Sequence, residues 1–331
     1  MDTTSSSPSD LPSIAGSARP GPGSPQPRTD ATGRLPAAGG RALVLGGGGS
    51  TGHAWLVGVL AGLVAGGLDV TSPDLTVGTS AGATVAAQLG SVSPAELYAG
   101  ALTPVPAAQA GAARGHPGGS VARRVSAQVQ RVSDTAAGAR DVADMRRRVG
   151  AAALRWAAES DGSWQAQWRA TVAARLGDAR WPTRTVLLTA VDAETGEPVV
   201  FDRDSGVDLV DAVAASCSSR LPYRIGDRHY IDGGYRANAE NADLAAGHRR
   251  VLVLAPFGGR ALTPVEWGTH LAAQVEALRE GGSTVRTVVP DGEAEHLFGL
   301  NAMDVSLRPA AARTGYAQGG ALAQHLAGFW R

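Results

Sequence analysis

A G-x-S-x-G pentapeptide limits the possible folds of this chain more than any other feature. It occupies residues 78–82 and directly follows the apolar run 75–77, while residues 83–89 after it have the composition of a helix. A strand, a tight turn with a central serine and then a helix form the context of a nucleophile elbow, where flanking glycines allow the sharp turn. Ser80 is therefore a candidate nucleophile. The alternative is an ordinary strand-to-helix turn, since the chain has 44 glycines.

A glycine-rich loop lies upstream of the elbow. The apolar run 41–45 leads into the sequence GGGGSTG at residues 46–52, and apolar residues at helical spacing follow it. Such a loop leaves backbone N–H groups uncovered at the positive end of a helix, so it can hold an anion.

Three roles compete for this loop. A G-x-G-x-x-G dinucleotide fingerprint starts at Gly47, with Asp69 or Asp74 as the acid expected further on. A Walker A loop is excluded, because the chain contains no lysine. The third role is an oxyanion hole for Ser80, and the elbow after the next strand favours it.

A third motif is the Asp-Gly-Gly tripeptide at residues 232–234, after the short strand pattern Arg-His-Tyr-Ile. A carboxylate fixed at the end of a strand can accept a serine proton or orient another group that does so. By itself, Asp-Gly-Gly is also an ordinary loop sequence.

Together and in this order, the three motifs resemble those of the patatin-like phospholipase family. The small-residue segment 214–222, which leads to the Asp-Gly-Gly tripeptide, is similar to the corresponding segment of the family. The resemblance extends roughly over residues 41–320, and the ordered set of motifs is highly specific.

The resemblance implies a serine acyl hydrolase that cleaves lipid carboxylic esters, as phospholipases A and lysophospholipases do. It implies a Ser–Asp dyad without a catalytic histidine, with Ser80 as the nucleophile and Asp232 as its base. The amides of Gly47, Gly48 and Gly49 would form the oxyanion hole, and neither a cofactor nor a metal is expected. The implied fold is a three-layer α/β/α arrangement around a mostly parallel sheet.

The chain departs from the family at one position of the loop. Family members often have an arginine there, in a G-G-G-x-R-G pattern, where this chain has Thr51. A positive charge near the substrate headgroup is therefore missing locally, whereas the backbone donors remain.

A Ser-acid-His triad is the rival catalytic plan, since common α/β-hydrolases have the histidine after the acid. His248, His270, His296 and His325 all follow Asp232. His325 lies in a predicted helix interior, whereas a triad histidine normally lies on a loop. His296 is less easily excluded as a triad histidine. Only one strand and one helix fit before the elbow, and this favours the dyad. The histidine beside the loop, residue 53, is interpreted as part of a helix start.

Composition is consistent with a soluble enzyme. The 331 residues suit one large α/β domain, and 30 acidic against 30 basic residues argue against nucleic acid as a partner. The single Cys217 excludes an internal disulfide and is interpreted as a buried filler. No C-x-x-C or H-E-x-x-H spacing suggests a metal.

Residues 1–39, rich in Ser, Pro, Gly and Thr, predict a disordered tail before a hydrolase domain at 40–331. The tail has no signal-peptide pattern, and no apolar run approaches the roughly 20 residues that span a bilayer. The sequence thus predicts a cytoplasmic protein, with any peripheral membrane contact made by its folded surface.

Strand and helix patterns alternate after the elbow, which favours a mostly parallel sheet. The predicted strands are 184–191, 198–201, 250–255 and 284–289. The predicted helices are 209–215, 265–280 and 308–329, the last with a break near 319–320.

A helical insertion is predicted at about 104–180. It has many arginines and three tryptophans, at positions 156, 164 and 168. One interpretation is a lid or a membrane-facing surface, and the other is a pair of solvated helices whose tryptophans face the core.

Two other function classes remain open. One is a nucleotide-binding protein or oxidoreductase that uses the glycine-rich loop. The other is a catalytically weak lipid-binding or interaction protein, which the missing loop arginine supports.

Overall fold

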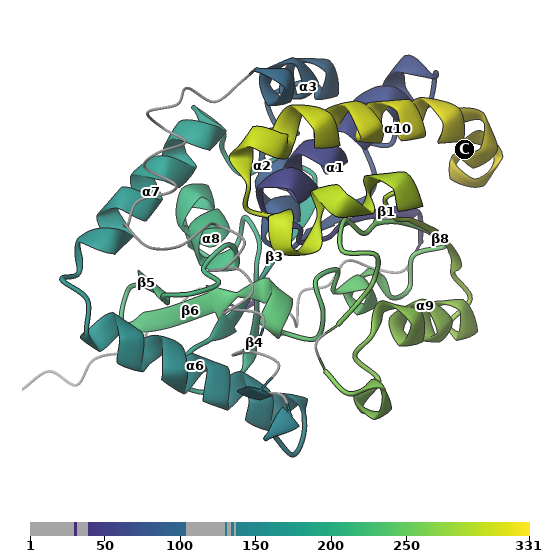
Figure 1. Ribbon diagram of the computed structural model, residues 1–331. Coiled ribbons are helices and arrows are strands. Elements are labelled where there is room, and N and C mark those ends of the chain that lie inside the picture. The colour runs from purple at the N-terminus through teal and green to yellow at the C-terminus, as the bar shows by residue number, and fades with distance from the viewer. Residues whose placement is uncertain (1–29, 32–38, 104–129, 131–133, 136, 262) are drawn as a thin grey trace, which may run out of the picture.

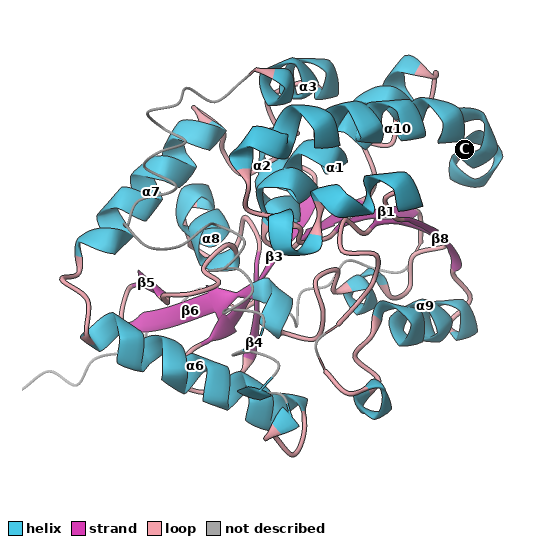
Figure 2. Cartoon of the chain, viewed as in Figure 1, coloured by secondary structure: helices cyan, strands magenta, loops and turns pink. Residues whose placement is uncertain are grey.

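The computed structural model describes residues 30–31, 39–103, 130, 134–135, 137–261 and 263–331. A central sheet has helices on both of its faces (Figures 1 and 2). The predicted α/β fold class is therefore confirmed.

The described residues form an eight-stranded sheet. Parallel pairing links β8 to β7, β7 to β1, β1 to β2 and β2 to β3, while β4, β5 and β6 add antiparallel pairings. The sheet is thus mostly parallel, as predicted. Its strands are β1 (Arg41–Leu45), β2 (Leu75–Gly78), β3 (Thr185–Asp192), β4 (Pro198–Phe201), β5 (Tyr223–Ile225), β6 (Arg228–Asp232), β7 (Arg250–Leu254) and β8 (Thr284–Val288).

Alternate residues of the strands face two different cores, as the two-residue period of a strand requires. Leu43 and Leu45 pack in one core with α1, α2, α8 and α10, whereas Ala42 and Val44 pack in the other with α9. The α-helices are α1 (Gly49–Ala65), α2 (Ala81–Gln88), α3 (Pro94–Leu102), α6 (Val142–Ala158), α7 (Ser163–Leu176), α8 (Leu209–Ser216), α9 (Leu271–Glu280) and α10 (Arg308–Trp330). Short 3-10 turns occupy Gly233–Tyr235, Ala242–Ala245, Val265–Trp267, Gly292–Leu297, Gly299–Asn301 and Val305–Leu307.

The predicted break near 319–320 is wrong, because α10 is one continuous helix. The glycines there serve close packing against α1. A Cβ on Gly315 or Gly319 would collide with a backbone carbonyl of α1, and a Cβ on Gly58 or Gly62 would collide with one of α10. Small residues at such a crossing let two helix backbones approach closely, so a helix-weakening residue is retained.

The predicted helix at 265–280 is wrong in its first part. A 3-10 turn, Val265–Trp267, ends at Gly268, which has a φ of 65° in the left-handed region. The α-helix α9 begins only at Leu271. Gly268 ends the first turn because glycine adopts positive φ without a steric penalty.

Helices α6 and α7 belong to the predicted insertion. Helix α6 packs against β3 and β6, whereas α7 packs against α8 and α2 (Figure 1). Trp164 and Trp168 pack against the core, and Trp168 Nε1 donates to the carbonyl of Ala214 at 3.0 Å. For these two tryptophans, the interpretation that they face the core is therefore correct. Residues 104–129 of the insertion lie outside the described residues.

Most of the predicted tail also lies outside the described residues. Asp30 and Ala31 do not fit the expectation of a disordered tail. The amide of Ala31 donates to Val200 O at 2.7 Å, and the amide of Val200 donates to Asp30 Oδ1 at 2.9 Å. Strand β4 has unpaired backbone groups on this edge, and these bind the passing chain.

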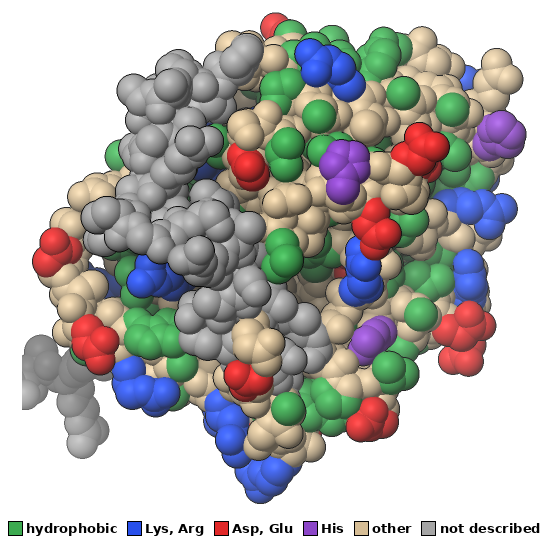
Figure 3. Space-filling view, in the orientation of Figure 1, with side chains coloured by type: hydrophobic (Ala, Val, Ile, Leu, Met, Phe, Trp, Pro, Cys, Tyr) green, Lys and Arg blue, Asp and Glu red, His purple; other side chains and the backbone are tan. Residues whose placement is uncertain are grey.

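No helix among the described residues is long and apolar enough to cross a membrane. On the face shown in Figure 3, acidic and basic side chains are interspersed, in keeping with a formal net charge of zero.

Candidate active site

Ser80 occupies a strained turn between β2 and α2. Its φ of 52° and ψ of −113° lie outside the regions that residues with a side chain normally adopt. Among the described residues, Asn241 is the other non-glycine with positive φ. A Cβ on Gly82 would collide with the carbonyl oxygen of Leu45. The second glycine of the elbow is therefore required by the close approach of β1.

Asp232 ends β6 and faces Ser80. The hydroxyl of Ser80 donates to Asp232 Oδ2 at 2.9 Å, and the amide of Gly234 donates to Oδ1 at 2.8 Å. The side chain is buried, with 7% of the residue exposed. Burial raises the pKa of Asp232 to about 6, against the opposing effect of its hydrogen bonds with Gly234 and Ser80. A carboxylate with this pKa is a better proton acceptor near neutral pH than an ordinary aspartate.

The sheet register explains why the two side chains meet. Leu188 of β3 pairs with both β2 and β4, and Ala190 pairs with both β4 and β6. A strand has two edges, so β2 and β6 lie along the same edge of β3, opposite β4. Their ends point at each other, because Gly78 pairs with Leu188 and Asp232 with Ala190. The candidate nucleophile and the carboxylate thus face each other across a gap next to Thr189.

The glycine-rich loop adjoins Ser80. An added Cβ on Gly47 would lie 3.4 Å from Ser80 Cβ, but the amide of Gly47 already donates to Ala239 O at 2.8 Å. The amides of Gly48 and Gly49 have no hydrogen-bond acceptor in the described part of the chain. Gly49 begins α1 with a φ of 62°. Of the three predicted oxyanion donors, Gly48 and Gly49 therefore have free N–H groups.

A model of the patatin-like phospholipase family matches residues 43–243. This stretch is more than half of the chain and contains the loop, the elbow and the Asp-Gly-Gly tripeptide. The chain belongs to the patatin-like phospholipase family. Hydrolysis of lipid acyl esters is the general activity of this family.

No curated protein matches this patatin-like chain. Among solved structures, VipD from Legionella pneumophila is similar at 13% identity and a TM-score of 0.37, over 88% of this chain and 67% of that one.

The two acids considered for a dinucleotide site are engaged elsewhere. Asp74 accepts from the amide of Arg41 at 2.7 Å, at the end of β1 opposite the glycine-rich loop. Asp69 accepts from the amide and hydroxyl of Thr71. Neither acid faces the loop, so the fingerprint lacks the carboxylate that would bind a ribose.

Asn241 is a site residue that the sequence analysis missed. Its backbone is left-handed, with φ 54° and ψ 43°, and its side-chain amide points toward Thr79 and Gly233. Asn241 Nδ2 donates to Thr79 Oγ1 and to Gly233 O, both at 3.0 Å. Asn241 thus connects the residue before the candidate nucleophile to the residue after the candidate base. Asparagine tolerates left-handed backbone better than most residues, but nothing local in the sequence indicates that Asn241 adopts it.

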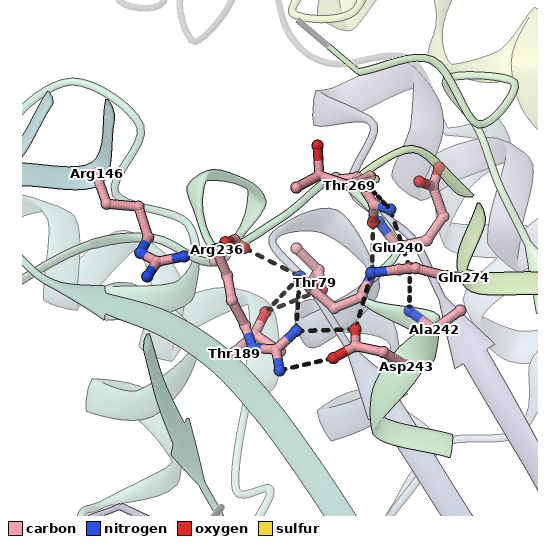
Figure 4. Close-up of polar contacts among 12 residues, drawn as sticks. Thr79, Arg146, Thr189, Arg236, Glu240, Ala242, Asp243, Thr269 and Gln274 are labelled. Atoms are coloured by element: carbon pink, nitrogen blue, oxygen red, sulfur yellow. Dashed lines mark hydrogen bonds and ion pairs between the residues drawn. The ribbon is translucent and has the colours of Figure 1, made fainter. Parts of the chain in front are cut away.

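Arg236 Nη1 donates to Asn241 Oδ1 at 3.2 Å and belongs to a second set of polar contacts (Figure 4). Thr79 and Thr189 share a hydrogen bond of 2.9 Å between their hydroxyls. Arg236 makes a bidentate contact with Asp243, with distances of 2.9 and 2.8 Å, and Gln274 donates to the same carboxylate. The loop after Asp232 is therefore held by charge-assisted hydrogen bonds, which are stronger than neutral ones.

Ser216, the last residue of α8, and Cys217, which follows it, contact the backbone of Ser80. Ser216 Oγ accepts from the Ser80 amide at 3.0 Å, and Cys217 Sγ donates to the Ser80 carbonyl at 3.1 Å. Burial raises the pKa of Cys217 to about 12, so its thiol stays protonated. Cys217 was interpreted as a buried filler, but it is partly exposed and its hydrogen bond supports the elbow.

No histidine in the described part of the chain is hydrogen-bonded to Ser80 or Asp232. His296 and His325 are exposed and bond backbone carbonyls of their own turns. His53 lies in the first turns of α1, as predicted, and contacts Gln88. Among the described residues, no cluster of His, Cys, Asp and Glu could hold a metal ion.

Proposed function

We propose that this patatin-like chain is a serine acyl hydrolase of lipid carboxylic esters that uses a Ser80–Asp232 dyad. The observation that carries the proposal is the 2.9 Å hydrogen bond from Ser80 Oγ to Asp232 Oδ2 at a strained elbow. A nucleophile held in hydrogen-bond contact with its base is the arrangement that covalent catalysis needs.

In the proposed reaction, Ser80 Oγ attacks the ester carbonyl while Asp232 takes its proton. The free amides of Gly48 and Gly49 donate to the developing oxyanion. Asp232 then returns the proton to the leaving alcohol, and an acyl-enzyme on Ser80 remains. Water attacks this ester by the same steps, which releases the fatty acid and the free serine.

The burial of Asp232 supports its proposed role as the base. Its pKa of about 6 keeps it ionised at neutral pH, yet brings it closer to the pKa of a hydroxyl than an ordinary aspartate. A triad would need a histidine between the two side chains, and their direct hydrogen bond leaves no room for one.

Labelling with a fluorophosphonate probe tests the proposal. We expect the wild type to gain one probe adduct by intact mass and to hydrolyse p-nitrophenyl butyrate, and Ser80→Ala to do neither while keeping its melting temperature. Ser91→Ala, an exposed serine at the far end of α2, is a matched control that keeps both activities. Labelling that persists in Ser80→Ala would contradict the assignment.

A further inference from the structure

Helix α6, from the predicted insertion, packs closely against the strands beside the candidate base. Its apolar side chains share a small buried cluster with Ile231, the residue before Asp232. An added Cβ on Gly150 of α6 would collide with the carbonyl oxygen of Ala193, directly after β3. The helix backbone is therefore in contact with the end of β3, and this contact fixes the points from which the polar side chains of α6 extend.

Arg146 extends from α6 to the loop that follows Asp232 (Figure 4). Its Nη1 donates to the backbone carbonyl of Arg236 at 2.9 Å, and its Nε donates to the carbonyl of Gly196 at 2.7 Å. The guanidinium thus connects the turn between β3 and β4 with the loop after β6. Only 9% of Arg146 is exposed, so both hydrogen bonds are largely shielded from water.

The two acceptors of Arg146 are uncharged, although buried charges are usually paired with an opposite charge. Burial lowers the pKa of Arg146, because its charged form loses hydration, and the charge of Glu197 offsets this only in part. A methionine would fill a similar volume without this cost. The charge therefore serves the two hydrogen bonds rather than the packing of α6, since charge-assisted hydrogen bonds are stronger than neutral ones.

The backbone of Arg236 leads back to Asp232 through one short turn. The amide of Arg236 donates to the carbonyl of Gly233 at 3.1 Å. The next amide, that of Gly234, donates to Asp232 Oδ1 at 2.8 Å. This turn has the carboxylate at one end and the carbonyl bound by Arg146 at the other. A displacement of that carbonyl would therefore move the Gly234 amide relative to the carboxylate.

The side chain of Arg236 is held separately from its backbone. Its guanidinium pairs with Asp243 at 2.8 and 2.9 Å and donates to Asn241 Oδ1 at 3.2 Å. These contacts lie at the far end of a flexible side chain, whereas Arg146 binds the backbone itself. The position of the Arg236 carbonyl therefore depends on Arg146.

We propose that Arg146 is a positioning residue for the candidate base, and that α6 is thereby part of the framework of the active site. The inference rests on the proposed Ser80–Asp232 dyad. Arg146 holds the turn after Asp232, so that one carboxylate oxygen stays directed at the Gly234 amide and the other at Ser80. Arg146 acts through Arg236 and not on the substrate.

The test compares Arg146→Met with Arg155→Met, a substitution of an exposed arginine of the same helix. Both remove one positive charge, but the first also removes the hydrogen bonds to Gly196 and Arg236. With p-nitrophenyl butyrate, we expect kcat of Arg146→Met to fall about tenfold or more while KM changes little, because misplacement of a reacting group by about 1 Å is costly. Arg155→Met should keep the kcat of the wild type.

The pH profile separates positioning from a general loss of stability. The Gly234 amide stabilises the ionised carboxylate, so a weaker hydrogen bond raises the pKa of Asp232 above about 6. The acid limb of kcat/KM should therefore move to higher pH by about 0.5–1 unit in Arg146→Met and stay in place in Arg155→Met. Arg146→Gln, whose amide is too short to reach both carbonyls, gives the same comparison if methionine destabilises the fold.

Hydrogen exchange of the backbone at 233–236 gives a readout that needs no turnover. We expect these amides to exchange faster in Arg146→Met than in the wild type or Arg155→Met, because the turn has lost an anchor. An unchanged kcat and acid limb in Arg146→Met would overturn the inference even if its melting temperature fell, and so would an equal loss in Arg155→Met. If Asp232→Asn keeps its activity, the proposed dyad fails instead, and the exchange data still show whether Arg146 holds the turn.

Discussion

Gly78 and Asp232 pair with residues two positions apart on β3, and this relationship creates the site. Strand β2 runs parallel to β3 and β6 runs antiparallel to it, on the same edge, so their ends converge. The elbow serine and the aspartate meet at 2.9 Å although 152 positions separate them in the sequence. The geometry of the proposed dyad is thus set by backbone pairing, and hydrogen bonds of side chains such as Asn241 then hold the two loops in place.

The pKa of Asp232 predicts how activity depends on pH. The base must be ionised, so kcat/KM on an uncharged ester should be flat above about pH 6 and fall about tenfold per pH unit below it. Asp232→Asn should lower kcat by about 10²–10⁴-fold, because an amide cannot accept the proton. Rates with p-nitrophenyl butyrate between about pH 4.5 and 8.5 provide the measurement. His296→Ala is the control, and a loss in it equal to that in Asp232→Asn would favour a triad instead.

Asn241 offers a test of positioning. Asn241→Gly keeps the left-handed backbone but removes the amide that bonds Thr79 and Gly233. We expect kcat to fall about tenfold or more while KM changes little, since misplacement of a reacting group by about 1 Å is costly. The pKa seen in the pH profile should also shift, because the Asp232 loop loses its anchor. An unchanged kcat and pH profile with a lower melting temperature would show a purely structural role.

The elbow, the Asp-Gly-Gly loop and most strands were predictable because their determinants are local. Glycines, alternating apolar residues and a strand-turn-helix order are visible within a few residues of Ser80. The hydrophobic patterns at 184–191 and 198–201 also gave the observed neighbours β3 and β4. The short β5 was missed, since three residues of a hairpin give no periodic pattern.

Residues that act across long sequence separations were not predictable. Nothing near Arg308 indicates that it contacts Ser50, 258 positions earlier. The glycines of α10 suggested a break because a local pattern cannot reveal the carbonyls of α1 that lie against them. The preference of glycine for turns was overridden here by the packing of two helices.

Glu240 predicts how stability depends on pH. It is buried beneath the glycine-rich loop, and no side chain among the described residues pairs with its carboxylate. Burial raises its pKa to about 7, from an ordinary value of 4.5. Between these two values the unfolded chain loses the proton while the folded protein keeps it, so the free energy of unfolding falls by about 3 kcal/mol.

Glu240→Gln removes this titration. Relative to wild type, the variant should therefore gain about 3 kcal/mol between pH 4.5 and pH 7, whatever its stability at low pH. Urea unfolding curves across this range provide the measurement, and Glu266→Gln, on the exposed turn of Val265–Trp267, is the control. Parallel pH curves for wild type and Glu240→Gln would show that Glu240 does not titrate abnormally.

The contact between α1 and α10 gives a matched pair of substitutions on one helix. Gly319 and Gly328 both lie in α10, but a Cβ on Gly319 would collide with the carbonyl of Val59, whereas nothing lies within 4 Å of a Cβ on Gly328. Gly319→Ala should therefore lower the free energy of unfolding by about 1–3 kcal/mol, the usual cost of overpacking. Gly328→Ala should raise it by up to about 1 kcal/mol, because alanine favours a helix over glycine. Urea denaturation of the two variants checks both signs, and equal effects would mean that the helices are not in backbone contact at Gly319.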